Sequence, residues 1–317
     1  MLINTILSAL LPLVVTFLLG FVAAWRHDFG PREASVLNRM VLVYAVPLAL
    51  FAGTVTTSRR ELGQDLPLIF ALGVAIMGLF AIVLLVCHFL IRLPMSASAL
   101  AALTASAPAV PFVGPSVLGE LFGRTSAIPI AAGSLIINLT VVPVTILLLA
   151  LGTDGRHAAP AATPQHSLFL TKLRETAQEP IVWAPVLAFI MVLCGVHVPQ
   201  VIVHSVSLLG HASGGVAMFA SGIVLASGRI TTTPSVVSLV FLKNIAQPLF
   251  VFVGLRSLGY GNPVLSEAVL TTAVPTMPIV ILFALQYHVR ETETASAVFL
   301  SVIASVVTMG MFIALTS

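Results

Sequence analysis

Long stretches without a charged residue recur along this 317-residue chain, and they constrain its fold more than any other feature. The longest, residues 181–228, contains no Asp, Glu, Lys or Arg. A bilayer core about 30 Å thick is crossed by about 20 apolar helical residues, so this stretch is long enough for two spans. Charged residues make up only 8% of the chain, against roughly 25% in soluble domains. The predicted fold class is therefore an all-α membrane protein, with lipid as the solvent for most of its surface.

The apolar stretches predict ten transmembrane helices. The expected spans lie near residues 5–25, 36–56, 66–91, 96–122, 125–150, 181–198, 203–227, 234–257, 263–287 and 293–315. No Lys or Arg precedes the first span, so we interpret it as a retained helix and not as a cleaved signal peptide. The chain divides into a first five-helix unit (1–151), a linker (152–180) and a second five-helix unit (181–317).

The loop charges predict an orientation in the membrane. With ten spans, nine basic residues fall on one side: Arg26, Arg32, Arg39, Arg92, Arg156, Lys172, Arg174, Arg229 and Arg290. Four fall on the other side: Arg59, Arg60, Arg124 and Arg256. Cytoplasmic loops carry the excess of positive charge, so we expect the linker in the cytoplasm and both termini outside the inner membrane.

Two five-helix units joined by one long linker suggest an inverted repeat, because five spans return the chain to the membrane in the opposite orientation. Two short motifs match at a nearly constant offset. Pro47-Leu-Ala-Leu-Phe-Ala-Gly53 resembles Gly215-Val-Ala-Met-Phe-Ala-Ser-Gly222, and Pro108-Ala-Val-Pro111 matches Pro275-Thr-Met-Pro278. The offsets are 168 and 167, and the matching spans have equivalent places in the two units.

The Pro-x-x-Pro pairs predict that the fourth and ninth helices are broken and cross. Proline lacks the backbone N–H and clashes with the preceding turn, and broken backbone inside a membrane is tolerated only within protein or beside a water-filled cavity. The new helix N-termini would suit an anion. The candidate substrate-binding residues at the breaks are Pro108, Pro111, Phe112, Gly114, Thr272, Pro275, Thr276 and Pro278. Proline kinks without a site are the alternative.

The motifs, taken in order, resemble the auxin efflux carrier family over essentially the whole chain. They comprise Leu11-Pro12 with Leu19-Gly20, Asn38…Pro47, the segment Gly114-Pro-Ser-Val-Leu-Gly-Glu-Leu-Phe-Gly123, Lys243-Asn…Gln-Pro248 and Ala-Val-Pro275. The resemblance implies ten helices with both termini outside, a scaffold of spans one, two, six and seven, and a mobile unit with the crossed spans four and nine. Bacterial members include carriers thought to move malonate and other small carboxylates. Many members have asparagine at the span-four crossover, where this chain has Pro111-Phe-Val-Gly-Pro115.

Polar residues inside spans are further candidates. A lysine at the centre of a membrane helix costs about 2.5–3.5 kcal/mol, so Lys243 should face protein or water, with Asn244 and Gln247 beside it. It either balances a bound carboxylate or supports the crossover. Asn138 is the matching candidate in span five, or a bridge between helices.

Four histidines lie in or beside spans: His88, His197, His204 and His211. Each could relay protons near neutral pH or pack at a helix interface. Gly210-His-Ala-Ser-Gly214 is a small-xxx-small pattern that predicts close helix packing. The two cysteines lie in apolar runs without metal-type spacing, and we expect no disulfide, metal or cofactor.

The predicted function is secondary transport of a small organic anion, such as malonate, by alternating access. The alternatives are a sodium-coupled symporter of the bile-acid carrier type, a channel, or an intramembrane enzyme, for which there is no HExxH, GxSG or paired intramembrane aspartate. The expected partners are the substrate, the lipid bilayer and a second copy of the chain at the scaffold helices, with no nucleic acid.

Overall fold

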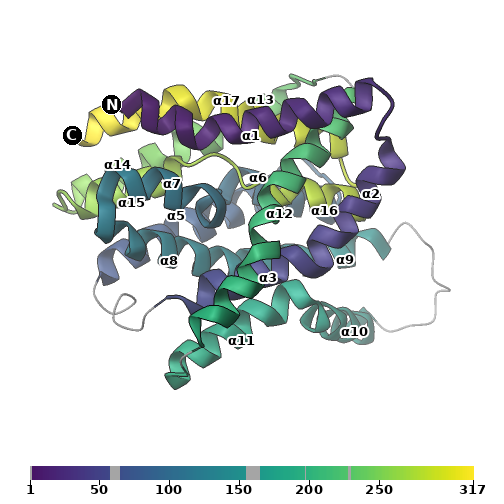
Figure 1. Ribbon diagram of the computed structural model, residues 1–317, viewed down its shortest axis with the longest axis horizontal. Helices are drawn as coiled ribbons and strands as arrows, with labels where there is room; N and C mark the ends of the chain where they lie inside the picture. Colours follow the sequence, from purple (N-terminus) through teal and green to yellow (C-terminus); the bar gives the residue numbers. More distant parts are fainter. Residues whose placement is uncertain (1, 58–64, 155–164, 197, 228–229) are drawn as a thin grey trace.

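The computed structural model describes the chain apart from residues 1, 58–64, 155–164, 197 and 228–229 (Figure 1). The described residues are helical, with no strand beyond one isolated bridge, which confirms the predicted all-helical class. His197 lies outside the described residues. Figure 1 shows the two ends of the chain at the same end of the molecule.

The first half consists of α1 (Leu2–Trp25), α2 (Pro31–Met40), η1 (Val41–Ala45), α3 (Val46–Val55), α5 (Leu66–Leu85), η2 (Val86–Leu90), α6 (Met95–Ser106), α7 (Val110–Phe122), η3 (Gly123–Ser126), α8 (Ala127–Ile136), η4 (Ile137–Val141) and α9 (Val142–Asp154). The linker contains α10 (Gln165–Gln178). The second half consists of α11 (Pro180–Cys194), α12 (Gln200–Ser227), α13 (Pro234–Phe241), η5 (Leu242–Ala246), α14 (Gln247–Ser257), α15 (Val264–Ala273), α16 (Ile279–Tyr287) and α17 (Glu291–Thr316).

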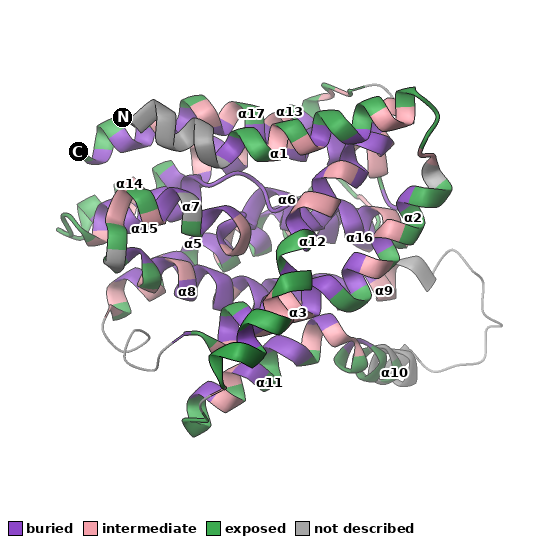
Figure 2. Ribbon diagram, in the orientation of Figure 1, coloured by how far each residue is buried: buried purple, intermediate pink, exposed green. Residues whose placement is uncertain are grey.

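Six helical stretches among the described residues are long and apolar enough to cross a membrane: 32–55, 66–90, 127–152, 200–226, 234–257 and 291–316. Shorter apolar helices lie at 10–25, 95–106, 180–194 and 264–273. Figure 2 shows exposed residues along the outer helices α1, α11 and α12, and buried residues on α6 and α16. Many exposed side chains are large and apolar, among them Leu90 and Leu208, each 79% exposed. A surface of this kind suits lipid. The crossing of ten spans stays a prediction.

Four of the long helical stretches contain a π-helical turn that could not be expected from the sequence: η1, η2, η4 and η5. Three of these turns, η1, η4 and η5, end two residues before a proline: Pro47, Pro143 and Pro248. A proline cannot donate to the carbonyl four residues earlier, and its ring clashes with that carbonyl. The wider π turn takes up this local mismatch, so the helices continue through their prolines.

The fourth and ninth predicted spans are both broken at their Pro-x-x-Pro pairs. Residues 107–109 separate α6 from α7, and residues 274–278 separate α15 from α16. The two extended segments lie antiparallel, with Pro108 paired to Thr276. The Ala109 N–H donates to the Pro275 carbonyl at 2.8 Å, and the Met277 N–H donates to the Ala107 carbonyl at 3.0 Å. The breaks thus supply hydrogen-bond partners to each other in the protein interior.

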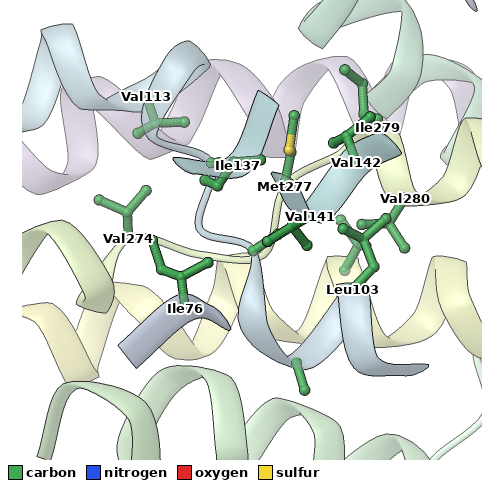
Figure 3. Close-up of a cluster of buried hydrophobic side chains, with 14 of the residues drawn as sticks. Ile76, Leu103, Val113, Ile137, Val141, Val142, Val274, Met277, Ile279 and Val280 are labelled. Atoms are coloured by element: carbon green, nitrogen blue, oxygen red, sulfur yellow. The ribbon is translucent and has the colours of Figure 1, made fainter. Parts of the chain in front are cut away.

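Apolar side chains enclose this crossing. Figure 3 shows Val113, Val274, Met277 and Ile279 among them, and all four are at most 3% exposed. The two hydrogen bonds between the segments are related by a constant shift in residue number. A shift of 168 takes residues 107 and 109 to 275 and 277, and thereby maps each bond onto the other.

Helix α12 runs diagonally across the molecule and packs against α1 and α3 (Figure 1). Small residues permit the close approach. A Cβ at Gly20 would lie 2.0 Å from the Phe219 carbonyl oxygen, and one at Gly222 would lie 2.1 Å from the Phe17 carbonyl oxygen. A Cβ at Gly210 would lie 2.8 Å from the Cα of Ala49 in α3. The close packing predicted for the Gly210–Gly214 pattern is confirmed.

Candidate functional site

A cavity of about 640 Å³ lies between two groups of helices. One wall comes from α1, α3 and α12, and the other from α7, α8 and η4. The polar residues that line it are Thr16, Thr56, Thr57, Ser134, Asn138, Gln200, His204, Ser207 and His211. None of its described lining residues is Asp, Glu, Lys or Arg. The cavity is therefore polar on several sides and carries no fixed charge.

The broken fourth helix supplies one wall. Helix α7 begins at Val110, with Pro111 in its first turn, where proline costs no hydrogen bond. Pro111, Phe112 and Pro115 line the cavity. The ring of Phe112 lies 3.1 Å from the position a Cβ on Gly214 would occupy. This contact brings α7 and α12 together at the cavity.

Asn138 contributes a side-chain amide from the π turn η4. It lines the cavity, is only 1% exposed, and its Oδ1 has no hydrogen-bond partner. Buried amides in proteins are nearly always hydrogen-bonded, and an exception requires an explanation. Asn138 lies on the π turn that ends two residues before Pro143, and π turns recur at functional sites. The Oδ1 thus remains able to accept a hydrogen bond from a donor group of a molecule in the cavity.

The remaining predicted site residues lie outside the cavity lining. Pro108, Pro275, Thr276 and Pro278 belong to the buried crossing, and Thr272 lies in the last turn of α15. The breaks meet as expected, but only the α7 side reaches the cavity.

Gly114 is buried on α7 and packs towards α8. A Cβ at this position would lie 3.2 Å from Val110 Cγ1 and 3.4 Å from Ile130 Cγ1. A larger side chain at Gly114 would therefore press on helix packing before it reached the cavity.

Lys243 and Asn244 lie on the π turn η5, and their side chains hydrogen-bond to residues at and beside the crossing. Lys243 is fully buried, and its Nζ donates to the Thr272 carbonyl at 2.6 Å. Asn244 Nδ2 donates to the Ser301 carbonyl at 2.8 Å, and Ser301 Oγ donates to Asn244 Oδ1 at 2.6 Å. The Thr276 N–H in turn donates to Ser301 Oγ at 2.9 Å.

Gln247 extends this network to the other broken helix. Its Nε2 donates to the Ser106 carbonyl at 2.9 Å. The last carbonyls of a helix have no partner within the helix, so α6 and α15 both end on donors from the same turn of the eighth span. Of the two roles considered for Lys243, the geometry favours support of the crossover.

The α12 wall of the cavity was not expected from the sequence. Gln200, His204, Ser207 and His211 line the cavity at spacings of four, three and four residues, which place them on one helical face. This polar stripe on a mostly apolar helix is a signal that could have identified the wall. Among the described residues, no cluster of three or more His, Cys, Asp or Glu side chains could hold a metal ion.

Broken helices that cross inside an apolar helical protein, beside a polar-lined cavity, are features of membrane transporters. The chain matches the model of the family described as "Membrane transport protein" (Mem_trans) over residues 5–313. It therefore belongs to this family of membrane transporters, which confirms the resemblance to auxin efflux carriers.

Individual relatives cover nearly the same length. The chain is 31% identical over 308 residues to "Uncharacterized transporter YfdV" of Escherichia coli (strain K12), which spans 96% of this chain and 95% of the relative. The YfdV protein of Shigella flexneri matches equally. A "Putative malonate transporter" of Rhizobium meliloti (strain 1021) is 22% identical over 306 residues, 96% of this chain and 93% of the relative.

Proposed function

We propose that this protein is a secondary transporter that moves a small organic anion, a carboxylate such as malonate, across the bacterial inner membrane by alternating access. The observation that carries the proposal is the Asn138 amide. It is buried in the wall of a cavity of about 640 Å³, and its Oδ1 lacks a partner. The Nδ2 hydrogens of an asparagine amide donate hydrogen bonds to a carboxylate, and its free Oδ1 accepts one from a hydroxyl or a protonated carboxyl group. The described lining holds no Asp or Glu that would repel an anion.

The position of the cavity supports alternating access. It separates helices α1, α3 and α12 from helices α7 and α8. The first group belongs to the scaffold implied by the family resemblance, and α7 is half of a crossed helix. We propose that α6–α7 and α15–α16 move as a unit against the scaffold, so that the cavity faces each side of the membrane in turn.

The inverted repeat, with ten spans and both termini outside, is part of the proposal. The shift of 168 that relates the two hydrogen bonds of the crossing equals the offset of the motifs at Pro47 and Gly215. A pseudo-twofold axis through the Pro108–Thr276 pair would produce this correspondence. The agreement between these two shifts supports a common origin of residues 1–151 and 181–317.

The test is uptake of radiolabelled malonate by proteoliposomes that contain the purified protein. Asn138→Ala should raise the malonate concentration for half-maximal uptake about tenfold or more, because a hydrogen bond to a charged group contributes about 1.5–3 kcal/mol. Loss of the Oδ1 should not by itself lower the stability, since this atom has no partner.

Asn38→Ala is the matched control. Asn38 is also a buried asparagine with an unpartnered Oδ1, but it does not line the cavity. Uptake should be unchanged in this variant. Equal effects of the two substitutions would contradict the site, and no uptake of malonate or other small carboxylates would contradict the function. Uptake that requires Na⁺ would favour a sodium-coupled symporter.

A further inference from the structure

Two histidines are the titratable side chains of the cavity. Among the described lining residues, α1, α3, α7, α8 and η4 contribute apolar, hydroxyl and amide groups and no titratable ones. Helix α12 contributes His204 and His211. Any positive charge that the described lining offers an anion must therefore come from an imidazole. Histidine is the side chain whose charge ordinarily changes between about pH 5 and 8.

The two imidazoles lie at different positions along the α12 wall of the cavity. They are seven residues apart, about two helical turns or about 10 Å along α12, and so lie on one face. His204 is about one turn from the start of α12, and Thr56 and Thr57, which follow α3, line the same cavity. His211 is three residues before Gly214, which contacts the Phe112 ring of α7. An anion that enters along α12 would pass His204 and reach His211 beside the broken helix.

The charge of the two imidazoles determines how well the cavity binds an anion. An anion that leaves water for a cavity without a countercharge incurs a large desolvation cost. A protonated imidazole nearby offsets that cost, and the anion in return favours the protonated form. Binding of the proton and binding of the anion are then positively coupled, each by the same factor.

We infer that the protein carries the anion together with a proton, and that His204 and His211 are the groups that hold this proton. The inference rests on the proposed function. It assigns the coupling ion and adds two residues of α12 to the substrate site. His211, next to the α7 contact, holds the proton when the anion is seated, and His204 holds it during entry.

The experiment measures malonate accumulation in proteoliposomes with an imposed pH gradient and a pH-sensitive dye inside. In the wild-type protein, acid outside should drive accumulation, and the dye should report proton entry that depends on malonate. Uptake should rise as the external pH falls from 7.5 to 5.5, and this rise should depend on His204 and His211. The His204→Gln/His211→Gln variant should lose both the gradient-driven accumulation and the proton signal.

Two further variants keep the result interpretable. His211→Lys supplies a fixed positive charge, so uptake should persist but respond less to pH, a change that a misfolded protein would not show. His88→Gln is the matched control, because His88 lies outside the cavity lining with its Nδ1 3.2 Å from the Leu93 carbonyl oxygen. This control should keep the wild-type pH response.

Each outcome separates the inference from the function on which it rests. If the double glutamine variant keeps the wild-type pH response, the proton travels on the substrate and the inference is wrong, although transport itself stands. If the wild-type protein takes up malonate and the dye reports no proton entry, the inference is likewise wrong, although transport itself stands. If the wild-type protein moves no small carboxylate at all, the proposed function fails and the inference fails with it.

Discussion

Replacement of Gly222 by alanine should weaken the contact between α1 and α12. The added Cβ would lie 2.1 Å from the Phe17 carbonyl oxygen and 2.6 Å from the Phe21 backbone nitrogen. Ordinary contact begins near 3.4 Å, so the helices must separate locally by about 1.3 Å. Both obstacles are backbone atoms inside a helix, and no side-chain rotation relieves the clash.

The cost follows from this separation. Overpacking of a tight site costs about 1–3 kcal/mol, and a gap of 0.5–1 Å already removes about a quarter to a half of a dispersion contact. Because backbone must move, we expect a value near the upper end, about 3 kcal/mol. Alanine returns up to about 1 kcal/mol through its higher helix propensity. The net loss is about 2 kcal/mol, which lowers the melting temperature by about 3 °C for a chain of this length.

Gly78→Ala is the matched control for this prediction. Gly78 lies inside α5, and a Cβ there would meet nothing within 4 Å. The same chemical change should leave the melting temperature unchanged or slightly raised. The assay is thermal unfolding of the purified variants in detergent, followed by size-exclusion chromatography after heating. If Gly222→Ala melts at or above the temperature of Gly78→Ala, the contact between α1 and α12 has room for a methyl group and the reasoning is refuted.

Two further predictions test topology and the support of the crossing. In a cysteine-free background, a membrane-impermeant thiol reagent applied to intact cells with a permeabilised outer membrane should label Ser317→Cys and not Pro160→Cys; the opposite pattern would reverse the orientation. Lys243→Met and Lys243→Ala both remove the donor to the Thr272 carbonyl, but only alanine leaves a void in this fully buried position. We expect the alanine variant to be less stable than the methionine variant by about 2–5 kcal/mol, measured as the difference between their melting temperatures. Equal stabilities would mean that the packing around Lys243 closes over the void.

Much of the fold can be predicted from the sequence because solvent and backbone chemistry act locally. Charge-free stretches require lipid contact, and their lengths place the helices within a few residues of the observed bounds. The breaks could also be predicted, because Pro108, Pro111, Pro275 and Pro278 remove backbone donors wherever they lie. The π turns could not, since a proline inside a helix permits a kink, a break or a wider turn, and neighbouring helices decide among them.

The site depends on tertiary structure to a greater degree. The sequence identifies Lys243 as a residue that must avoid lipid, but its partner, the Thr272 carbonyl, exists only because α15 ends there against η5. Asn138 and His211 both line one cavity although 72 intervening residues separate them in the chain. Local patterns determine which residues are helical, apolar or broken. The packing of α12 against α1, α3 and α7 decides which of them share a cavity, because such contacts depend on side-chain shape across distant segments of the chain.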